Sequence, residues 1–153
     1  MHIMLIDCYN IAHAAFHSMG ELDYHGRQTG VMFGFMLRML QLAKTYETNQ
    51  FIFCWDSQHS IRKIMWPAYK KKDKVENYTT SETIDYMALH DQMDELRKYV
   101  LYKLGFSNVL LYAGLEADDV VALVIQNSTI PDAWLTNGVA EFLIISTDKD
   151  LYQ

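Results

Sequence analysis

Four short apolar runs, each followed by acidic residues, constrain the fold of this 153-residue chain more than any other feature. The runs are too short and too uniformly apolar for amphipathic helices, and they are typical of strands buried on both faces of a parallel sheet. We expect these strands at residues 2–7, 51–55, 108–112 and 142–146.

Acidic residues gather where the predicted strands end. Asp7 and Asp56 end the first two runs, and a Glu-Ala-Asp-Asp segment at 116–119 follows the third. Asp148 and Asp150 follow the fourth run. Because the functional crevice of an open α/β sheet lies beyond the carboxyl ends of its strands, Asp7, Asp56 and Asp148 should share one edge. Crowded carboxylates repel one another unless a cation neutralises them, and hard oxygen ligands suit Mg²⁺ or Mn²⁺. The predicted metal ligands are Asp7, Asp56, Glu116, Asp118, Asp119, Asp148 and Asp150.

Each of these acids also has a structural explanation when it is taken alone. The acids of 116–119 suit the positive end of a helix, and one of them can be its cap. Asp148 and Asp150 fit a polar turn, and Asp7 and Asp56 fit strand-end or capping positions. Three carboxylates in four residues exceed what capping requires, and the coincidence at several strand ends favours a common site.

Helices are predicted between the strands, so the fold class is α/β, a three-layer sandwich around a mainly parallel sheet. Residues 30–46 carry apolar side chains at three- and four-residue spacing, and residues 82–104 do the same. Ser81 is the expected N-cap of the second helix and Gly105 its C-terminal stop. Shorter helices are expected at 10–18 and 118–127, and polar loops at 19–29 and 127–138. Residues 57–81 show no regular spacing of apolar residues.

The composition indicates one folded domain. Half of the residues are apolar and only two are proline, which argues against a disordered chain. Cys8 and Cys54 are expected to be buried thiols of the core, in keeping with a reducing cytosol. We find neither a charged-then-apolar leader nor a run of about 18 apolar residues, so export and membrane insertion are not expected.

The distribution of charge favours a nucleic-acid partner, although the net charge of −6 argues against one. Six of the thirteen basic residues lie between Arg62 and Lys74, interleaved with Trp66, Tyr69 and Tyr78. Such a basic stripe beside an acidic pocket would hold a polyanion, and the aromatic faces would stack on bases. The alternative is a solvated lysine-rich loop. The predicted nucleic-acid-binding residues are Arg62, Lys63, Tyr69, Lys70, Lys71, Lys72 and Lys74.

Several other chemistries find no support in the sequence. It contains no nucleophile elbow and no glycine-rich phosphate loop. His13 and His17 have the i, i+4 spacing of metal ligands, but no third ligand accompanies them. An aspartyl-nucleophile phosphatase would need a second aspartate two positions after Asp7, where Tyr9 stands.

An ordered set of motifs resembles the 5′-nuclease (flap endonuclease) family, which includes the 5′→3′ exonuclease domain of bacterial DNA polymerase I and phage enzymes. The resemblance covers residues 4–153, and EADD and TDKDLYQ are its most specific motifs. It implies a PIN-like fold and metal-dependent hydrolysis of phosphodiesters near the 5′ ends of branched or single-stranded DNA. The motifs are LIDCYNIAHAAFHS, GVMFGFMLRMLQL, FIFCWD, IRKIMWPAYKKK, LGFSNVLLYAGLEADDVVALV and ISTDKDLYQ.

The resemblance also implies roles for individual residues. Asp148 and Asp150 would serve a second metal, and Arg62 and Lys70 would contact the scissile phosphate. The arch through which a single-stranded 5′ end passes would span residues 69–89, within a region of about 62–90. The first metal would be held by Asp7, Asp56, Glu116, Asp118 and Asp119. The implied catalytic residues are Lys70, Arg62 and Asp118.

The sequence departs from the family pattern at some positions. Cys8 replaces the usual glycine, and Asp73 stands where a basic residue is common. Residues 1–153 would form the N-terminal domain alone, without the helix-hairpin motif and two further aspartates of the second metal site.

Two alternative functions stay open. One is a non-catalytic nucleic-acid-binding subunit or fragment, completed by a second polypeptide that supplies the C-terminal part. The other is a PIN-type ribonuclease, which would prefer RNA. A DNA strand with a 5′ end or flap is the expected partner, with RNA in RNA–DNA hybrids as a further one.

Overall fold

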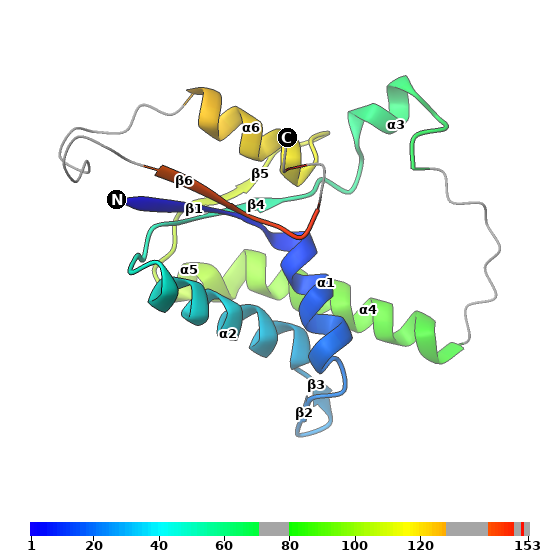
Figure 1. Ribbon diagram of the computed structural model, residues 1–153. Helices are drawn as coiled ribbons and strands as arrows, with labels where there is room; N and C mark the ends of the chain where they lie inside the picture. The colour runs from blue at the N-terminus through cyan, green and yellow to red at the C-terminus, as the bar shows by residue number, and fades with distance from the viewer. Residues whose placement is uncertain (71–79, 128–140, 149–150, 152–153) are drawn as a thin grey trace.

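A parallel sheet of four strands, in the order β5-β4-β1-β6, forms the centre of the computed structural model, which describes residues 1–70, 80–127, 141–148 and 151 (Figure 1). The register pairs Asp7 with Cys54 and Ile6 with Ile145, so the central strands end at the same edge. The strands are β1 (His2–Asp7), β4 (Phe51–Trp55), β5 (Val109–Leu111) and β6 (Glu141–Ile145), as the apolar runs predicted.

Helices cover both faces of the sheet and complete the predicted three-layer α/β fold. Helix α6 (Ala117–Asn127) lies on one face, and α1, α2, α4 and α5 lie on the other (Figure 1). The remaining bounds are α1 (Cys8–Met19), α2 (Gly30–Thr45), α3 (Ile61–Met65), α4 (Thr80–Glu95), a π-helix η1 (Leu96–Val100) and α5 (Leu101–Lys103). None of the helices within the described residues is long and apolar enough to cross a membrane.

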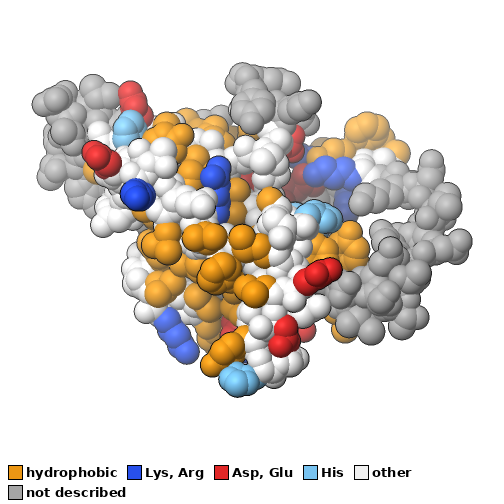
Figure 2. Space-filling model, turned by 60° about the horizontal axis from the view of Figure 1, so that its bottom comes forward, with side chains coloured by type: hydrophobic (Ala, Val, Ile, Leu, Met, Phe, Trp, Pro, Cys, Tyr) orange, Lys and Arg blue, Asp and Glu red, His pale blue; other side chains and the backbone are white. Residues whose placement is uncertain are grey.

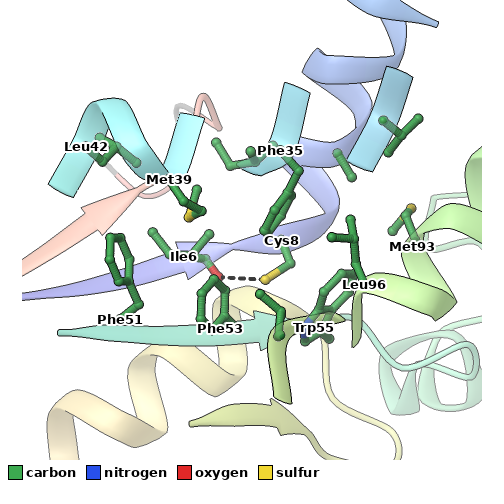
Figure 3. Close-up of a cluster of buried hydrophobic side chains, with 14 of the residues drawn as sticks. Ile6, Cys8, Phe35, Met39, Leu42, Phe51, Phe53, Trp55, Met93 and Leu96 are labelled. Atoms are coloured by element: carbon green, nitrogen blue, oxygen red, sulfur yellow. Dashed lines mark hydrogen bonds between the residues drawn. The ribbon is translucent and has the colours of Figure 1, made fainter. Parts of the chain in front are cut away.

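The larger core fills the space between the sheet and helices α1, α2 and α4 (Figure 3). Phe35 of α2 stacks on Trp55 of β4 at 6.2 Å between ring centroids, and Phe53 is fully buried beside them. Because successive strand residues face opposite sides, Leu5 and Cys54 join a second core under α6. Cys54 is fully buried, as expected for a thiol of the core, and this burial raises its pKa to about 12.

Helices α1 and α2 approach each other closely because two glycines leave room for them. A Cβ atom at Gly34 would lie 2.8 Å from the Cβ of Ala15, and one at Gly30 would lie 1.7 Å from the carbonyl oxygen of Met19. Because Gly30 and Gly34 have no side chains, the backbone of α1 can pack directly against α2 at these two positions.

The long helix predicted at 82–104 is observed as the succession α4, η1 and α5. The prediction of Ser81 as N-cap is wrong, because α4 begins at Thr80 and Ser81 lies in its first turn. Three neighbouring hydroxyl residues, at 79–81, can all cap a helix, so the sequence does not distinguish them. Gly105 ends the succession with a φ of +91°, as expected for a C-terminal stop.

A small hairpin lies within the segment that was predicted as a polar loop. Strands β2 (Asp23–Tyr24) and β3 (Arg27–Gln28) pair antiparallel, with Tyr24 opposite Arg27. The two residues between them, His25 and Gly26, both have positive φ, which is the signature of a type I′ turn. The strands are too short to show alternation in the sequence.

Gln92 joins the start of α2 to α4. Its Oε1 accepts hydrogen bonds from the backbone N–H groups of Val31 at 3.0 Å and Met32 at 3.2 Å, and the residue is 4% exposed. The side chain of Thr29, the residue at the N-cap position, makes no capping bond within the described structure. Gln92 therefore supplies the cap from a distant helix.

Replacing Gln92 with leucine is expected to lower the free energy of unfolding by about 1–3 kcal/mol, because it leaves the buried N–H of Val31 and the partly buried N–H of Met32 without this acceptor. Urea denaturation of the variant measures this loss, with exposed Gln41→Leu on α2 as the control. A change in the midpoint no larger than that of the control would contradict the capping role of Gln92.

Candidate active site

Asp7 ends β1 and begins α1, so it lies at the edge where the central strands stop. Its Oδ1 accepts a hydrogen bond from the backbone N–H of Asn10 at 3.2 Å, and its Oδ2 accepts one from the Ser146 hydroxyl at 2.8 Å. Burial raises the pKa of Asp7, and the charges of Asp148 and Asp118 raise it further. These three carboxylates, far apart in sequence, are therefore electrostatic neighbours.

Asp56 follows β4 at the same edge and joins it to α6. Its Oδ1 accepts the backbone N–H of Ala117 at 3.1 Å. Burial raises the pKa of Asp56 above its ordinary value, and the charges of Asp7 and Glu116 act in the same direction. Asp56 is thus both a structural acceptor for the first turn of α6 and part of the group of acids.

Glu116, Asp118 and Asp119, here called the acidic trio, lie at the start of α6. The N–H of Glu116 donates to Asp119 Oδ2 at 3.1 Å, and the N–H of Asp119 donates to Asp118 Oδ1 at 2.8 Å. The capping role considered for this segment is therefore real. It leaves Glu116 Oε2, Asp118 Oδ2 and Asp119 Oδ1 to other partners, and each of these oxygens contacts a basic side chain.

Arg62 of α3 contacts every member of the acidic trio. Its Nη1 lies 3.1 Å from Glu116 Oε2 and 3.1 Å from Asp118 Oδ2, and its Nη2 bonds to Asp119. The guanidinium group therefore balances much of the negative charge at the start of α6 in this structure.

Glu116 is the most enclosed member of the trio, at 7% exposure. Its Oε2 accepts hydrogen bonds from Lys70 Nζ at 2.8 Å and from the Tyr69 hydroxyl at 3.1 Å. Burial by itself would raise the pKa of Glu116, but hydrogen bonds from Lys70 and Ser60 lower it overall. Glu116 therefore stays ionised between two cations.

Asp148 lies beyond the end of β6 and is exposed. Its backbone N–H donates to the Ser146 hydroxyl at 3.0 Å, and that hydroxyl donates in turn to Asp7. Ser146 thus links the ends of β1 and β6, a role that the sequence analysis missed because a single serine after a strand gives no signal. Asp150, Lys71, Lys72 and Lys74 lie outside the described residues, and Lys63 is exposed on α3.

Helix α3 holds Arg62 over the acidic trio through bonds that the sequence does not reveal. The N–H of Ile61 donates to the carbonyl of Gly114 at 2.8 Å, and the N–H of Gly114 donates to the Ser57 hydroxyl at 3.0 Å. Ser60 caps the helix by accepting the N–H of Arg62 at 3.2 Å. The short helix is therefore fixed to the loop that precedes Glu116.

The donor set is suited to a hard divalent cation, since every candidate ligand offers carboxylate oxygens. Within the described residues, however, no three side chains of His, Cys, Asp or Glu are already arranged as a ligand cage. In this structure Glu116 of the acidic trio contacts Arg62 and Lys70 instead. Asp7 and Asp56 face the same region with unfavourable negative charge, which a cation would relieve.

Replacing Asp56 with asparagine is expected to stabilise the protein by about 1 kcal/mol, or about 2–4 °C in Tm, near neutral pH without divalent ions. A carboxyl whose pKa is raised by folding favours the folded state when protonated. Its contribution to stability falls as the pH rises from the ordinary value of 3.8 through the raised pKa of the folded state. The amide oxygen of the variant still accepts the N–H of Ala117.

Thermal unfolding of both proteins in EDTA, across acidic and neutral pH, checks this prediction. The gain should shrink as the pH falls through the raised pKa of Asp56 in the folded state and on toward 3.8. A variant that is less stable than the wild type near neutral pH would show that Asp56 carries no unfavourable charge.

Known proteins with a similar sequence pattern or a similar fold were found. A family model described as "5′-3′ exonuclease, N-terminal resolvase-like domain" matches residues 2–153. A crystal structure of the D15 protein of bacteriophage T5, co-crystallised with metal ions, is similar at a TM-score of 0.71 and 20% identity, over 98% of this chain and 50% of that chain. No curated protein sequence matches.

A second similar structure is a pseudo-enzyme-product complex of the bacteriophage T5 D15 flap endonuclease with DNA and metal ions. Its TM-score is 0.68 at 20% identity, over 97% of this chain and 50% of that chain. The present chain thus spans about half the length of both solved proteins. At this identity the likeness concerns the fold, which agrees with the α/β architecture described above.

Proposed function

Because the chain belongs to the 5′-3′ exonuclease family, as an N-terminal resolvase-like domain, we propose that it hydrolyses phosphodiesters near the 5′ ends of branched or single-stranded DNA. One observation carries the proposal beyond the family. Acids from separate strand ends, among them Asp7, Asp56 and Glu116, meet at the carboxyl edge of the sheet beside Arg62 and Lys70. An acidic group with adjacent cations suits a phosphodiester substrate.

The proposed cofactor is Mg²⁺ or Mn²⁺, in up to two sites. When bound, such an ion supplies an activated water and offsets negative charge on the phosphate. Asp148 and Asp150 are the proposed ligands of the second site. The proposed ligands of the first are Asp7, Asp56, Glu116, Asp118 and Asp119.

Arg62 and Lys70 are proposed to bind the scissile phosphate. Both already lie against the acidic trio, where their N–H groups contact carboxylate oxygens that resemble phosphate oxygens in charge and geometry. A phosphate that enters this place would accept the same donors, which would offset charge that develops during hydrolysis.

The wider DNA-binding surface is proposed to follow the basic stripe. Tyr69 and Lys63 belong to it, and the region of about 62–90 is proposed to form the arch for a single-stranded 5′ end. Lys71, Lys72 and Lys74 would extend it. Residues 1–153 are proposed to act as one N-terminal catalytic domain, to which a second polypeptide can contribute DNA-binding and metal-binding groups.

Cleavage of a labelled 5′-flap DNA in the presence of Mn²⁺, with EDTA as the control, tests the proposed function. We expect cuts near the flap junction that require the metal. Calorimetric titration with Mn²⁺ should reveal one or two sites, and binding to the folded form alone should raise Tm. DNA binding without metal binding or cleavage would favour a non-catalytic subunit, and cleavage of RNA alone would favour a ribonuclease.

A further inference from the structure

The end of α3 presents an apolar surface to solvent directly beside the candidate active site. Trp66 is 62% exposed, Ile64 76% and Met65 81%, and none of the five described residues of α3 is buried. Single exposed apolar residues are common on protein surfaces, but three consecutive ones beside a site make a contact surface worth testing.

Trp66 is held in a defined position relative to the acidic trio. Its backbone N–H donates to the carbonyl of Arg62 at 2.8 Å, and its carbonyl accepts the N–H of Tyr69 at 2.8 Å. The Trp66 and Tyr69 rings lie 6.1 Å apart at 41°, and the Tyr69 hydroxyl donates to Glu116. A continuous set of contacts therefore runs from the indole ring to the most enclosed acid of the site.

Cationic side chains lie beside Tyr69, the ring that Trp66 contacts. The guanidinium carbon of Arg62 lies 5.8 Å from the Tyr69 ring centroid, and Lys70 Nζ lies 5.3 Å from it. Lys63 is exposed on the same short helix. Figure 2 shows basic side chains in blue between acidic and hydrophobic ones toward the upper right of the molecule. Basic side chains beside an exposed aromatic ring suit a DNA strand, because the basic groups can bind its phosphates and the ring can contact its bases.

We propose that Trp66 stacks on an unpaired base of the DNA strand whose phosphate binds at Arg62 and Lys70. The inference rests on the proposed function and specifies its substrate, because only an unpaired nucleotide offers a base face that is not already covered by its neighbours. Stacking of bases on aromatic side chains is tolerant of sequence. Trp66 would therefore select single-stranded over duplex DNA beside the scissile bond.

Binding of a single-stranded oligodeoxythymidylate of about ten nucleotides, measured by fluorescence anisotropy in EDTA, tests the proposal without cleavage. Trp66→Ala is expected to weaken binding about 10-fold, and Trp66→Phe should retain most of the affinity. The matched control is Tyr99→Ala, which removes another aromatic side chain, 59% exposed, on η1. That control should bind as the wild type does.

Salt dependence separates stacking from phosphate contact. Trp66→Ala should leave the slope of log K against log salt unchanged, whereas Lys63→Gln should reduce it by about 0.7. Wild-type affinity in Trp66→Ala, equal losses for single-stranded and duplex DNA, or a change of oligomeric state alone would each overturn the proposal. The last result would identify the surface as a protein contact.

The two proposals fail in distinguishable ways. If the chain cuts no flap DNA but its binding to the oligonucleotide depends on Trp66, the proposed nuclease function fails and the stacking role stands. If Mn²⁺-dependent cleavage is intact and Trp66→Ala changes neither binding nor KM, the stacking role fails and the nuclease function stands.

Discussion

Replacing Asp118 with asparagine is expected to reduce Mn²⁺-supported cleavage of a 5′-flap DNA by about 10²–10³-fold, the size of effect seen when one group that stabilises transition-state charge is removed. The substitution removes a negative charge from the proposed metal ligands. It leaves Arg62 in contact with Glu116 and Asp119, and the amide oxygen can still accept the N–H of Asp119. The fold should therefore persist.

A gel-based cleavage assay under single-turnover conditions measures the loss. Asp91→Asn, at an exposed position on α4, is the matched control and should cut at the wild-type rate. Thermal unfolding should confirm that both variants are folded, and calorimetry should show weaker Mn²⁺ binding only for Asp118→Asn. Equal cleavage by wild type and Asp118→Asn would reject the assignment of this acid to the reaction.

Gly30→Ala is expected to lower the free energy of unfolding by about 3 kcal/mol or more, at the upper end of the cost of overpacking a core. The added methyl group would lie 1.7 Å from the carbonyl oxygen of Met19 and 2.6 Å from its carbonyl carbon. Both atoms belong to the backbone at the end of α1, so relief requires the two helices to move apart.

Gly34→Ala provides a graded comparison on the same helix. Its methyl group would lie 2.8 Å from the Cβ of Ala15, 3.3 Å from the Cα of Ala15 and 3.4 Å from the Met19 sulfur. This overlap is smaller than the 1.7 Å approach at Gly30, so the helices need to move apart less. In urea denaturation, Gly30→Ala should therefore have the lowest free energy of unfolding, Gly34→Ala an intermediate one and the wild type the highest. The reverse order would mean that α1 does not approach α2 as described.

Sequence reasoning predicted the sheet well because strands buried on both faces show continuous apolar runs. The strand at 51–55 and the helix that starts at Gly30 were expected at their observed positions. The placement of Asp7 and Asp56 at one edge followed from the same runs, since parallel strands carry their ends to the same side. These features depend on local pattern and on a general rule of topology.

Features that depend on contacts between distant residues could not be predicted in this way. Helix α3 has no apolar period because none of its described residues is buried, and it is held by Ser60 and by Gly114, far along the chain. The capping of α2 by Gln92 likewise cannot be predicted from the residues around Val31, because Gln92 lies on another helix. The salt bridges of Arg62 also require the fold, because α3 must first be placed over the acidic trio.

The position of β1 inside the sheet has a consequence for biosynthesis. One side of β1 pairs with β4, but the other side pairs with β6, so His2 meets Glu141. While the ribosome is still adding the residues between them, that side of β1 has no partner strand. Such distant pairing slows folding. We therefore expect nascent chains that end before residue 141 to expose an unpaired strand edge and to complete the sheet only once β6 has been made.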